Sequence, residues 1–174
     1  MVKDAGRGLA LVISKWDTLS SYENFDHDHF ITSITQAYEF VPWAPLVVTS
    51  SVSGQNVVKL FELALKIKQD RDIKVPTSKL NSWLGRAVLE HPPAGLKNRS
   101  PKLNYIVQET DNPIPAFKIF GSQTKFLHWS YKRYLERGLR EEFGFFGNPI
   151  QLWFIEKHEA HRHGEKPLQT KDIN

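Results

Sequence analysis

Charged side chains at the ends of two apolar segments are the residues of this sequence best placed for ligand chemistry. Lys15 and Asp17 follow directly on the apolar run Leu9–Ile13. A second apolar run, Leu46–Val48, leads into a stretch rich in hydroxyl residues, Thr49–Gly54. Continuous apolar runs are typical of parallel strands covered by helices, and ligands bind outside the carboxyl ends of such strands. The pattern therefore predicts a ligand site where these strands end.

Ser14-Lys15-Trp16-Asp17 resembles the N-K-x-D motif of P-loop GTPases with Ser in place of Asn, and Ser50–Gly54 is similar to their S-A-x-x-G motif. The resemblance implies a guanine site made by Ser14, Lys15, Asp17, Ser50 and Ser51. In it Asp17 accepts hydrogen bonds from guanine N1–H and the 2-amino group, Lys15 covers the ring with its stem, and the Ser51 N–H donates to O6. Adenine cannot pair with Asp17, and a buried polar group left unpaired costs roughly 1–3 kcal/mol. Ser14 can replace only part of the hydrogen bonding of the usual Asn.

The first part of the chain, residues 1–72, reads as β-α-β-α. Apolar residues recur at helical spacing between Asp26 and Glu39 and between Gln55 and Arg71, with a polar loop at 18–24. The sequence holds no P-loop (G-x-x-x-x-G-K-[ST]) and no D-x-x-G ahead of the first strand. We therefore expect the C-terminal half of a G domain, whose first strand has an exposed edge and whose partner is the missing N-terminal G-domain portion.

The second part, residues 73–157, reads as α-β-β-α-β. Thr77 or Ser78 is expected to cap a helix that ends near Glu90. Strands are expected near 103–107, 116–120 and 149–155, and a second helix at 130–143. The predicted fold class is therefore α/β: the C-terminal half of a P-loop GTPase domain followed by an α+β domain.

This second part resembles the KH-like C-terminal domain of the Der (EngA) family of bacterial tandem-G-domain GTPases. The likeness rests on stretches that include His91-Pro92-Pro93, Leu139–Phe145 and Gly147–Ile150. It implies the end of the second G domain plus a whole KH-like domain, from a cytoplasmic GTPase that acts in large ribosomal subunit assembly. GTP or GDP and Mg²⁺ would be ligands of the intact protein and ribosomal RNA its partner, with no membrane contact. We expect this chain alone to bind no cofactor and to be inactive, without catalytic residues or metal ligands.

Basic residues gather in the second part of the chain. Residues 1–72 hold seven Lys/Arg against nine Asp/Glu, and residues 73–174 hold sixteen against ten. A basic half favours a polyanionic partner such as RNA. The candidates are Lys97, Arg99 and Lys102 in a loop, and Lys132, Arg133, Arg137 and Arg140 on a helix. The helix face is more typical of i,i+4 ion pairs on an exposed helix, and no G-x-x-G loop of the RNA-clamping kind is present.

Other classes of function remain open alternatives. The chain could be a stand-alone RNA-binding module, or a protein-interaction module that binds no nucleotide. His158, His161 and His163 could ligate a metal, but we expect residues 158–174 to be a basic, disordered tail. The absence of cysteine excludes disulfides, and no apolar run reaches the length of about 18 residues that a membrane span needs.

Overall fold

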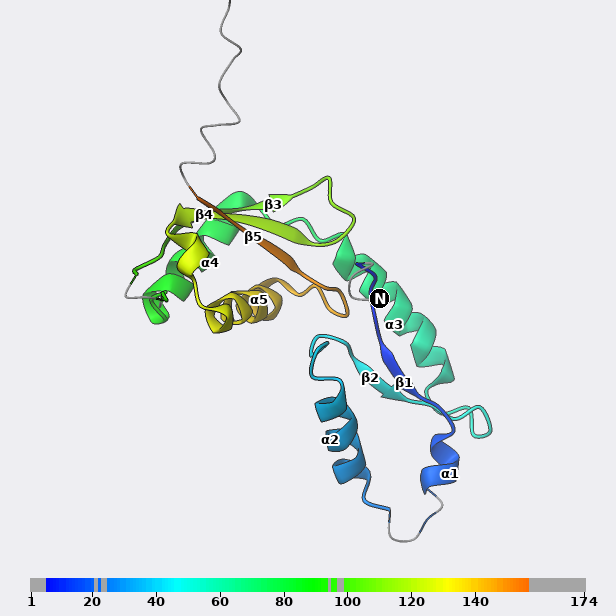
Figure 1. The fold of residues 1–174 in the computed structure, drawn as a ribbon. Coiled ribbons are helices and arrows are strands. Elements are labelled where there is room, and N and C mark those ends of the chain that lie inside the picture. Colours follow the sequence, from blue (N-terminus) through cyan, green and yellow to red (C-terminus); the bar gives the residue numbers. More distant parts are fainter. Residues whose placement is uncertain (1–5, 21, 23–24, 94, 97–98, 157–174) are drawn as a thin grey trace, which may run out of the picture. The chain divides into compact units, whose positions relative to one another are not determined.

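The computed structural model describes residues 6–20, 22, 25–93, 95–96 and 99–156 of the 174-residue chain. It contains a two-stranded parallel sheet, β1 (Leu11–Ile13) and β2 (Leu46–Val48), and a three-stranded sheet in the order β3-β4-β5 (Figure 1). The three-stranded sheet is made of β3 (Lys102–Glu109), β4 (Ala116–Ser122) and β5 (Gln151–Glu156). The predicted fold class, α/β followed by α+β, is confirmed.

The chain divides into two compact units that do not follow the order of the sequence. The first unit holds residues 6–74 together with 110–116 and 139–151, and the second holds 75–109, 117–138 and 152–156. The domain boundary at residue 72 stays a prediction, and each unit is described by itself.

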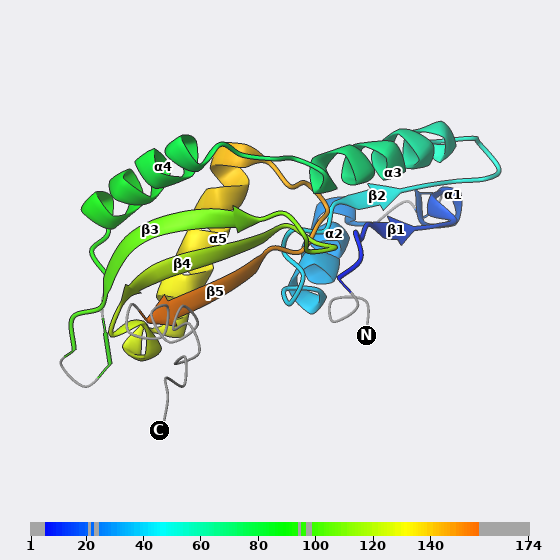
Figure 2. The same ribbon diagram turned by 90° about the horizontal axis from the view of Figure 1, so that it is seen from above.

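In the first unit, two helices lie on opposite faces of the parallel sheet (Figures 1 and 2). They are α2 (His27–Ala37) and α3 (Val57–Arg71), close to the helices predicted from the apolar spacing. Asp26 caps α2, because its carboxylate accepts a hydrogen bond of 2.9 Å from the His29 N–H. Asn56 precedes α3 in the left-handed conformation and donates its side-chain amide to the Val48 carbonyl.

Two expectations for this unit are wrong. The segment read as a polar loop begins with a short helix, α1 (Trp16–Ser20). The first strand is shorter than the apolar run, and Val12 in its centre is 48% exposed instead of buried on both faces. Within its sheet β1 pairs with β2 alone, so its other edge carries no strand in the described part of the unit, and Val12 lines an open groove beside α3.

Residues from the second half of the sequence complete the first unit through hydrogen bonds. The Asn148 side-chain amide donates to the Ile67 carbonyl at 2.7 Å, and the Leu9 N–H donates to the Gly147 carbonyl at 2.8 Å. Gly147 has a φ of 65°, and a Cβ there would lie 2.5 Å from Cγ1 of Ile67. Glycine is therefore required at 147, both for its conformation and for the close approach of α3.

In the second unit, α4 (Thr77–Glu90) and residues 129–138 of α5 (Trp129–Phe143) lie on the same face of the three-stranded sheet (Figure 1). Asn81 on α4 forms two hydrogen bonds of 3.0 Å with the backbone of Ile106 on β3. A short 3-10 helix, η1 (Thr124–Phe126), precedes α5. Side chains that are almost wholly buried form the core: Leu80, Leu84, Ile106, Phe117, Ile119 and Leu135.

The predicted start of α4 needs a correction. The residue at the N-cap is Pro76, and it makes no side-chain capping hydrogen bond. Thr77 and Ser78 are already inside the helix, so neither is its cap. Proline carries no N–H to be satisfied, and its fixed φ, here −56°, leads the chain into the first turn.

The tail over residues 158–174, with its three histidines, lies outside the described residues. Its composition is three Lys/Arg against three Asp/Glu, so it is basic only when the histidines are protonated. None of the described helices is long and apolar enough to cross a membrane.

Candidate guanine-binding site

Backbone hydrogen bonds join the carboxyl ends of β1 and β2. The Thr49 N–H donates to the Ile13 carbonyl at 2.7 Å, and the Trp16 N–H donates to the Thr49 carbonyl at 3.0 Å. Lys15 lies between these two bonds in the left-handed conformation, with a φ of 57°. The chain therefore turns sharply after β1, and the residues that follow each strand lie beside one another.

Ser50 links the two predicted motifs. Its side chain is fully buried, and its hydroxyl donates a hydrogen bond to Oδ1 of Asp17. The Ser50 hydroxyl oxygen also accepts hydrogen bonds from the Val52 and Ser53 N–H groups, at 3.2 and 3.1 Å. Ser50 was predicted to contact guanine, and the structure places its hydroxyl on Asp17. Its role there is to hold the carboxylate in one orientation.

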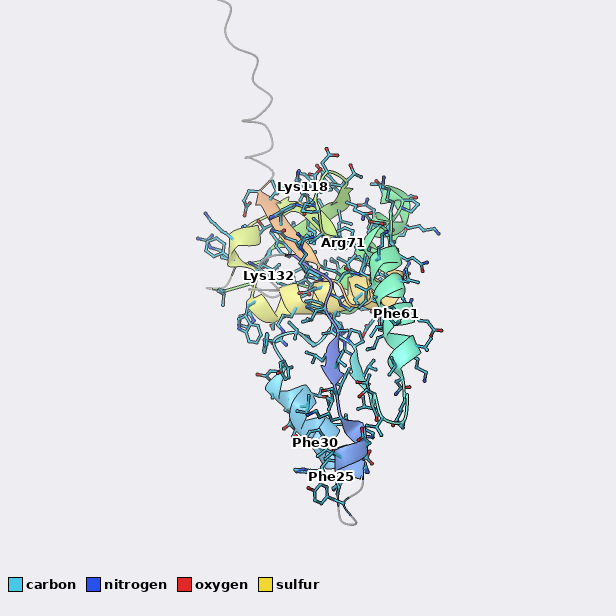
Figure 3. The ribbon with its side chains drawn as sticks, turned by 90° about the vertical axis from the view of Figure 1, so that its right-hand side faces the viewer. Phe25, Phe30, Phe61, Arg71, Lys118 and Lys132 are labelled. Atoms are coloured by element: carbon cyan, nitrogen blue, oxygen red, sulfur yellow. The ribbon has the colours of Figure 1, made fainter. Side chains whose placement is uncertain are left out.

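An aromatic cluster supports α1, and the sequence reasoning did not find it. Trp16, between Lys15 and Asp17, is buried against Phe25 and Phe30, with ring centroids at 6.1 and 6.3 Å. The rings of Phe25 and Phe30 are 5.3 Å apart, and Figure 3 labels the two side chains. His27 lies 5.1 Å from the Trp16 ring. The signal in the sequence was the group of aromatic residues around the start of α2. Their rings hold Trp16 and so fix the segment that carries Asp17.

The remaining predicted guanine ligands lie at the same edge. Ser14, Lys15 and Ser51 are exposed and Asp17 is half-buried, so solvent reaches all four residues. A carboxylate acceptor, a lysine stem and a backbone N–H fit the hydrogen-bonding edge and the face of guanine. In the part of the chain that the structure describes, no group of three or more His, Asp or Glu side chains could hold a metal ion.

Three of the basic residues predicted to bind RNA lie against aromatic rings of the second unit. Arg99 is 5.4 Å from the centre of the Phe126 ring, Lys132 is 5.2 Å from that of Phe154, and Arg133 is 5.6 Å from that of Trp129. Lys102 and Arg137 are exposed. Lys97 lies outside the described residues. Arg99 and Lys102 are therefore presented from the start of β3 and the loop before it, and Lys132, Arg133 and Arg137 from α5.

Arg140 behaves differently from the other basic residues on α5. Its Nη1 donates to the Phe145 and Asn148 carbonyls, both at 2.8 Å, and its guanidinium lies 5.8 Å from the centre of the Trp43 ring. These contacts hold the turn after α5 inside the first unit. We therefore leave Arg140 out of the residues proposed for RNA contact, because its Nη1 donates to two backbone carbonyls and its Nη2 is buried.

Comparison with known proteins covers most of the chain. Residues 74–154 match a family described as the KH-domain-like C-terminal domain of EngA bacterial GTPase enzymes. The GTPase Der of Thermomicrobium roseum is 38% identical over 160 residues, which is 91% of this chain and 35% of the relative. The chain belongs to the Der (EngA) family of GTPases.

Two further members of the Der family also match most of this chain. The GTPase Der of Chloroflexus aggregans is 39% identical over 88% of this chain and 34% of its own length. That of Gloeobacter violaceus is 36% identical over 95% of this chain and 36% of its own length. The chain thus spans about a third of the length of the Der relatives it matches. The likeness extends beyond the KH-like domain to the segment that carries Asp17 and Ser50.

Proposed function

We propose that this chain is part of a Der-type GTPase that acts in large ribosomal subunit assembly. It supplies the guanine-recognition edge of a GTP-hydrolysing domain and a KH-like domain that contacts RNA. One observation carries the proposal: Ser50 orients Asp17 where two parallel strands end side by side. A carboxylate held in this way is prepared for a ligand that offers two adjacent N–H donors. Guanine does so through N1 and its 2-amino group, and adenine does not.

A groove beside α3 supports the proposal that the N-terminal G-domain portion is a partner of this chain. The groove has a volume of about 520 Å³ and apolar walls that include Ala10, Val12, Leu60 and Leu63. No residue of α3 is buried, although the structure describes the whole helix, and Phe61 is 71% exposed (Figure 3). Exposed apolar surface of this kind fits a missing layer of the same domain. That portion would hold the phosphates and Mg²⁺, so we expect no hydrolysis by this chain alone.

The second unit supports a role in RNA contact. Its ranges 75–109, 117–138 and 152–156 hold ten Lys/Arg against four Asp/Glu. Such a surplus favours phosphate contacts, which confer affinity and salt dependence without reading the sequence. We propose Arg99, Lys102, Lys132, Arg133 and Arg137 for these contacts, together with Lys97 from the sequence alone. Assembly of ribosomes would place the protein in the cytoplasm.

The test of guanine recognition is a chimera in which residues 6–174 replace the matching part of the Thermomicrobium roseum GTPase Der. Asp17→Asn in this chimera is expected to weaken GDP binding at least about tenfold, since hydrogen bonds to a charged group contribute roughly 1.5–3 kcal/mol. The same variant should gain affinity for xanthosine diphosphate, because xanthine carries a carbonyl where guanine carries the 2-amino group. Binding is measured by fluorescence with labelled nucleotides.

The matched control is Asp28→Asn, which changes an exposed carboxylate in the first turn of α2. It should leave the affinities for both nucleotides unchanged. If Asp17→Asn kept the wild-type preference for GDP over xanthosine diphosphate, the assignment of Asp17 to the guanine edge would be wrong.

A further inference from the structure

The three-stranded sheet has one face that no helix of the second unit covers. Along β4, Phe117 and Ile119 are fully buried against the helices, whereas Lys118 and Phe120 are partly exposed on the other face. In Figure 2 the three strands lie in front and α5 lies behind them. Successive side chains of a strand alternate between the two faces. The second face of the sheet is therefore presented by every other residue of β3, β4 and β5.

Aromatic rings occupy this second face. Tyr105 on β3 and Phe120 on β4 are stacked, with ring centroids 4.5 Å apart and ring planes within 8° of parallel. Tyr105 is 44% exposed. A planar group that lies on the exposed side of Tyr105 would continue this stack.

A cation lies on the same face, within reach of another ring. Lys118 Nζ is 5.9 Å from the centre of the Trp153 ring on β5, and it forms an ion pair with Glu109 at the end of β3. The Lys118 side chain is 37% exposed and that of Glu109 is 28% exposed. A phosphate that approaches this face can therefore compete with Glu109 for the ammonium group.

We propose that the face of Tyr105, Phe120, Lys118 and Trp153, here called the aromatic sheet face, binds single-stranded RNA by stacking its bases. Two features favour RNA over an apolar protein surface. The rings are interleaved with a cation, and the ranges of the second unit carry the surplus of ten Lys/Arg over four Asp/Glu. Unpaired bases stack on aromatic side chains presented by a sheet, with phosphates on nearby cations. The inference rests on the proposed RNA contact and adds that the RNA bound by this face is single-stranded, with unpaired bases.

The test is fluorescence anisotropy of the full chain with a labelled oligouridine of about a dozen nucleotides, a length within the usual site size. Loss of one stacked base by Tyr105→Ala is expected to weaken binding by about 5- to 150-fold, with the salt slope unchanged because no charge is removed. Tyr105→Trp should restore the affinity. Glu109→Gln should tighten binding and make the salt slope steeper by about one phosphate contact, because Lys118 is released.

The matched control is Tyr38→Ala, which removes a tyrosine of similar exposure, 41%, from the end of α2 in the first unit. It should bind the oligonucleotide like the wild type, and a duplex of the same sequence should not respond to Tyr105→Ala. If Tyr105→Ala bound with wild-type affinity while Lys132→Ala and Arg133→Ala weakened binding, RNA contact would stand and the aromatic sheet face would be wrong. Absence of binding to any single strand at low salt would overturn both.

Discussion

Replacing Ser50 with alanine should open the edge that carries Asp17. The change removes the hydrogen bond that Ser50 donates to Asp17 and the two that it accepts from the Val52 and Ser53 N–H groups. At a net 0.5–1.5 kcal/mol each, three hydrogen bonds contribute roughly 1.5–4.5 kcal/mol. Val52 is 84% exposed, so water can reach part of this turn and replace some of the lost bonds. We therefore expect a loss of about 2 kcal/mol in local stability.

Hydrogen exchange of peptides that cover residues 46–56 measures this loss directly, because it reports local opening and not the unfolding of the whole chain. A loss of about 2 kcal/mol corresponds to roughly 30-fold faster exchange, since each 1.4 kcal/mol is a factor of ten. The matched control is Ser53→Ala. Ser53 is exposed and its hydroxyl accepts a long hydrogen bond, 3.4 Å, from the Gln55 N–H, so its loss should change exchange little. Equal exchange in the two variants would refute the view that Ser50 organises this edge.

Two further predictions concern stability. Gly147→Ala should lower the free energy of unfolding of the first unit by roughly 2–4 kcal/mol, because position 147 has a φ of 65° and the added Cβ would lie 2.5 Å from Ile67. Urea denaturation measures this loss, with Gly85→Ala as the control, since a Cβ at position 85 would meet no atom within 4 Å. Burial, with a smaller contribution from Tyr134, raises the pKa of Tyr131 to about 12, so stability present below pH 10 should be lost as the pH rises from 10 to 12. Tyr131→Phe should lose less stability than the wild type between pH 10 and 12, as denaturation measured across this pH range would show. An equal loss of stability in the two proteins would contradict the prediction.

The sequence by itself determined most of the secondary structure and the placement of the two motifs. Strong local signals account for this. The helix predicted at 130–143 is observed as Trp129–Phe143, and the spacing from Asp26 yields α2 with Asp26 as its cap. Apolar periodicity and capping side chains act over a few residues, so they can be read without knowledge of the fold.

Only the tertiary structure decided what the polar and aromatic side chains contact. Arg140 lies on the charged face of its helix by spacing, yet its guanidinium bonds the turn after that helix. Ser50 meets Asp17 across 33 residues of chain, and Tyr105 meets Phe120 across two strands. Such contacts depend on which strands become neighbours, and periodicity within one element carries no information about its neighbours. The proposed guanine edge was thus predictable as a pair of motifs, whereas the hydrogen bonds that support it and the aromatic sheet face could be found only from the fold.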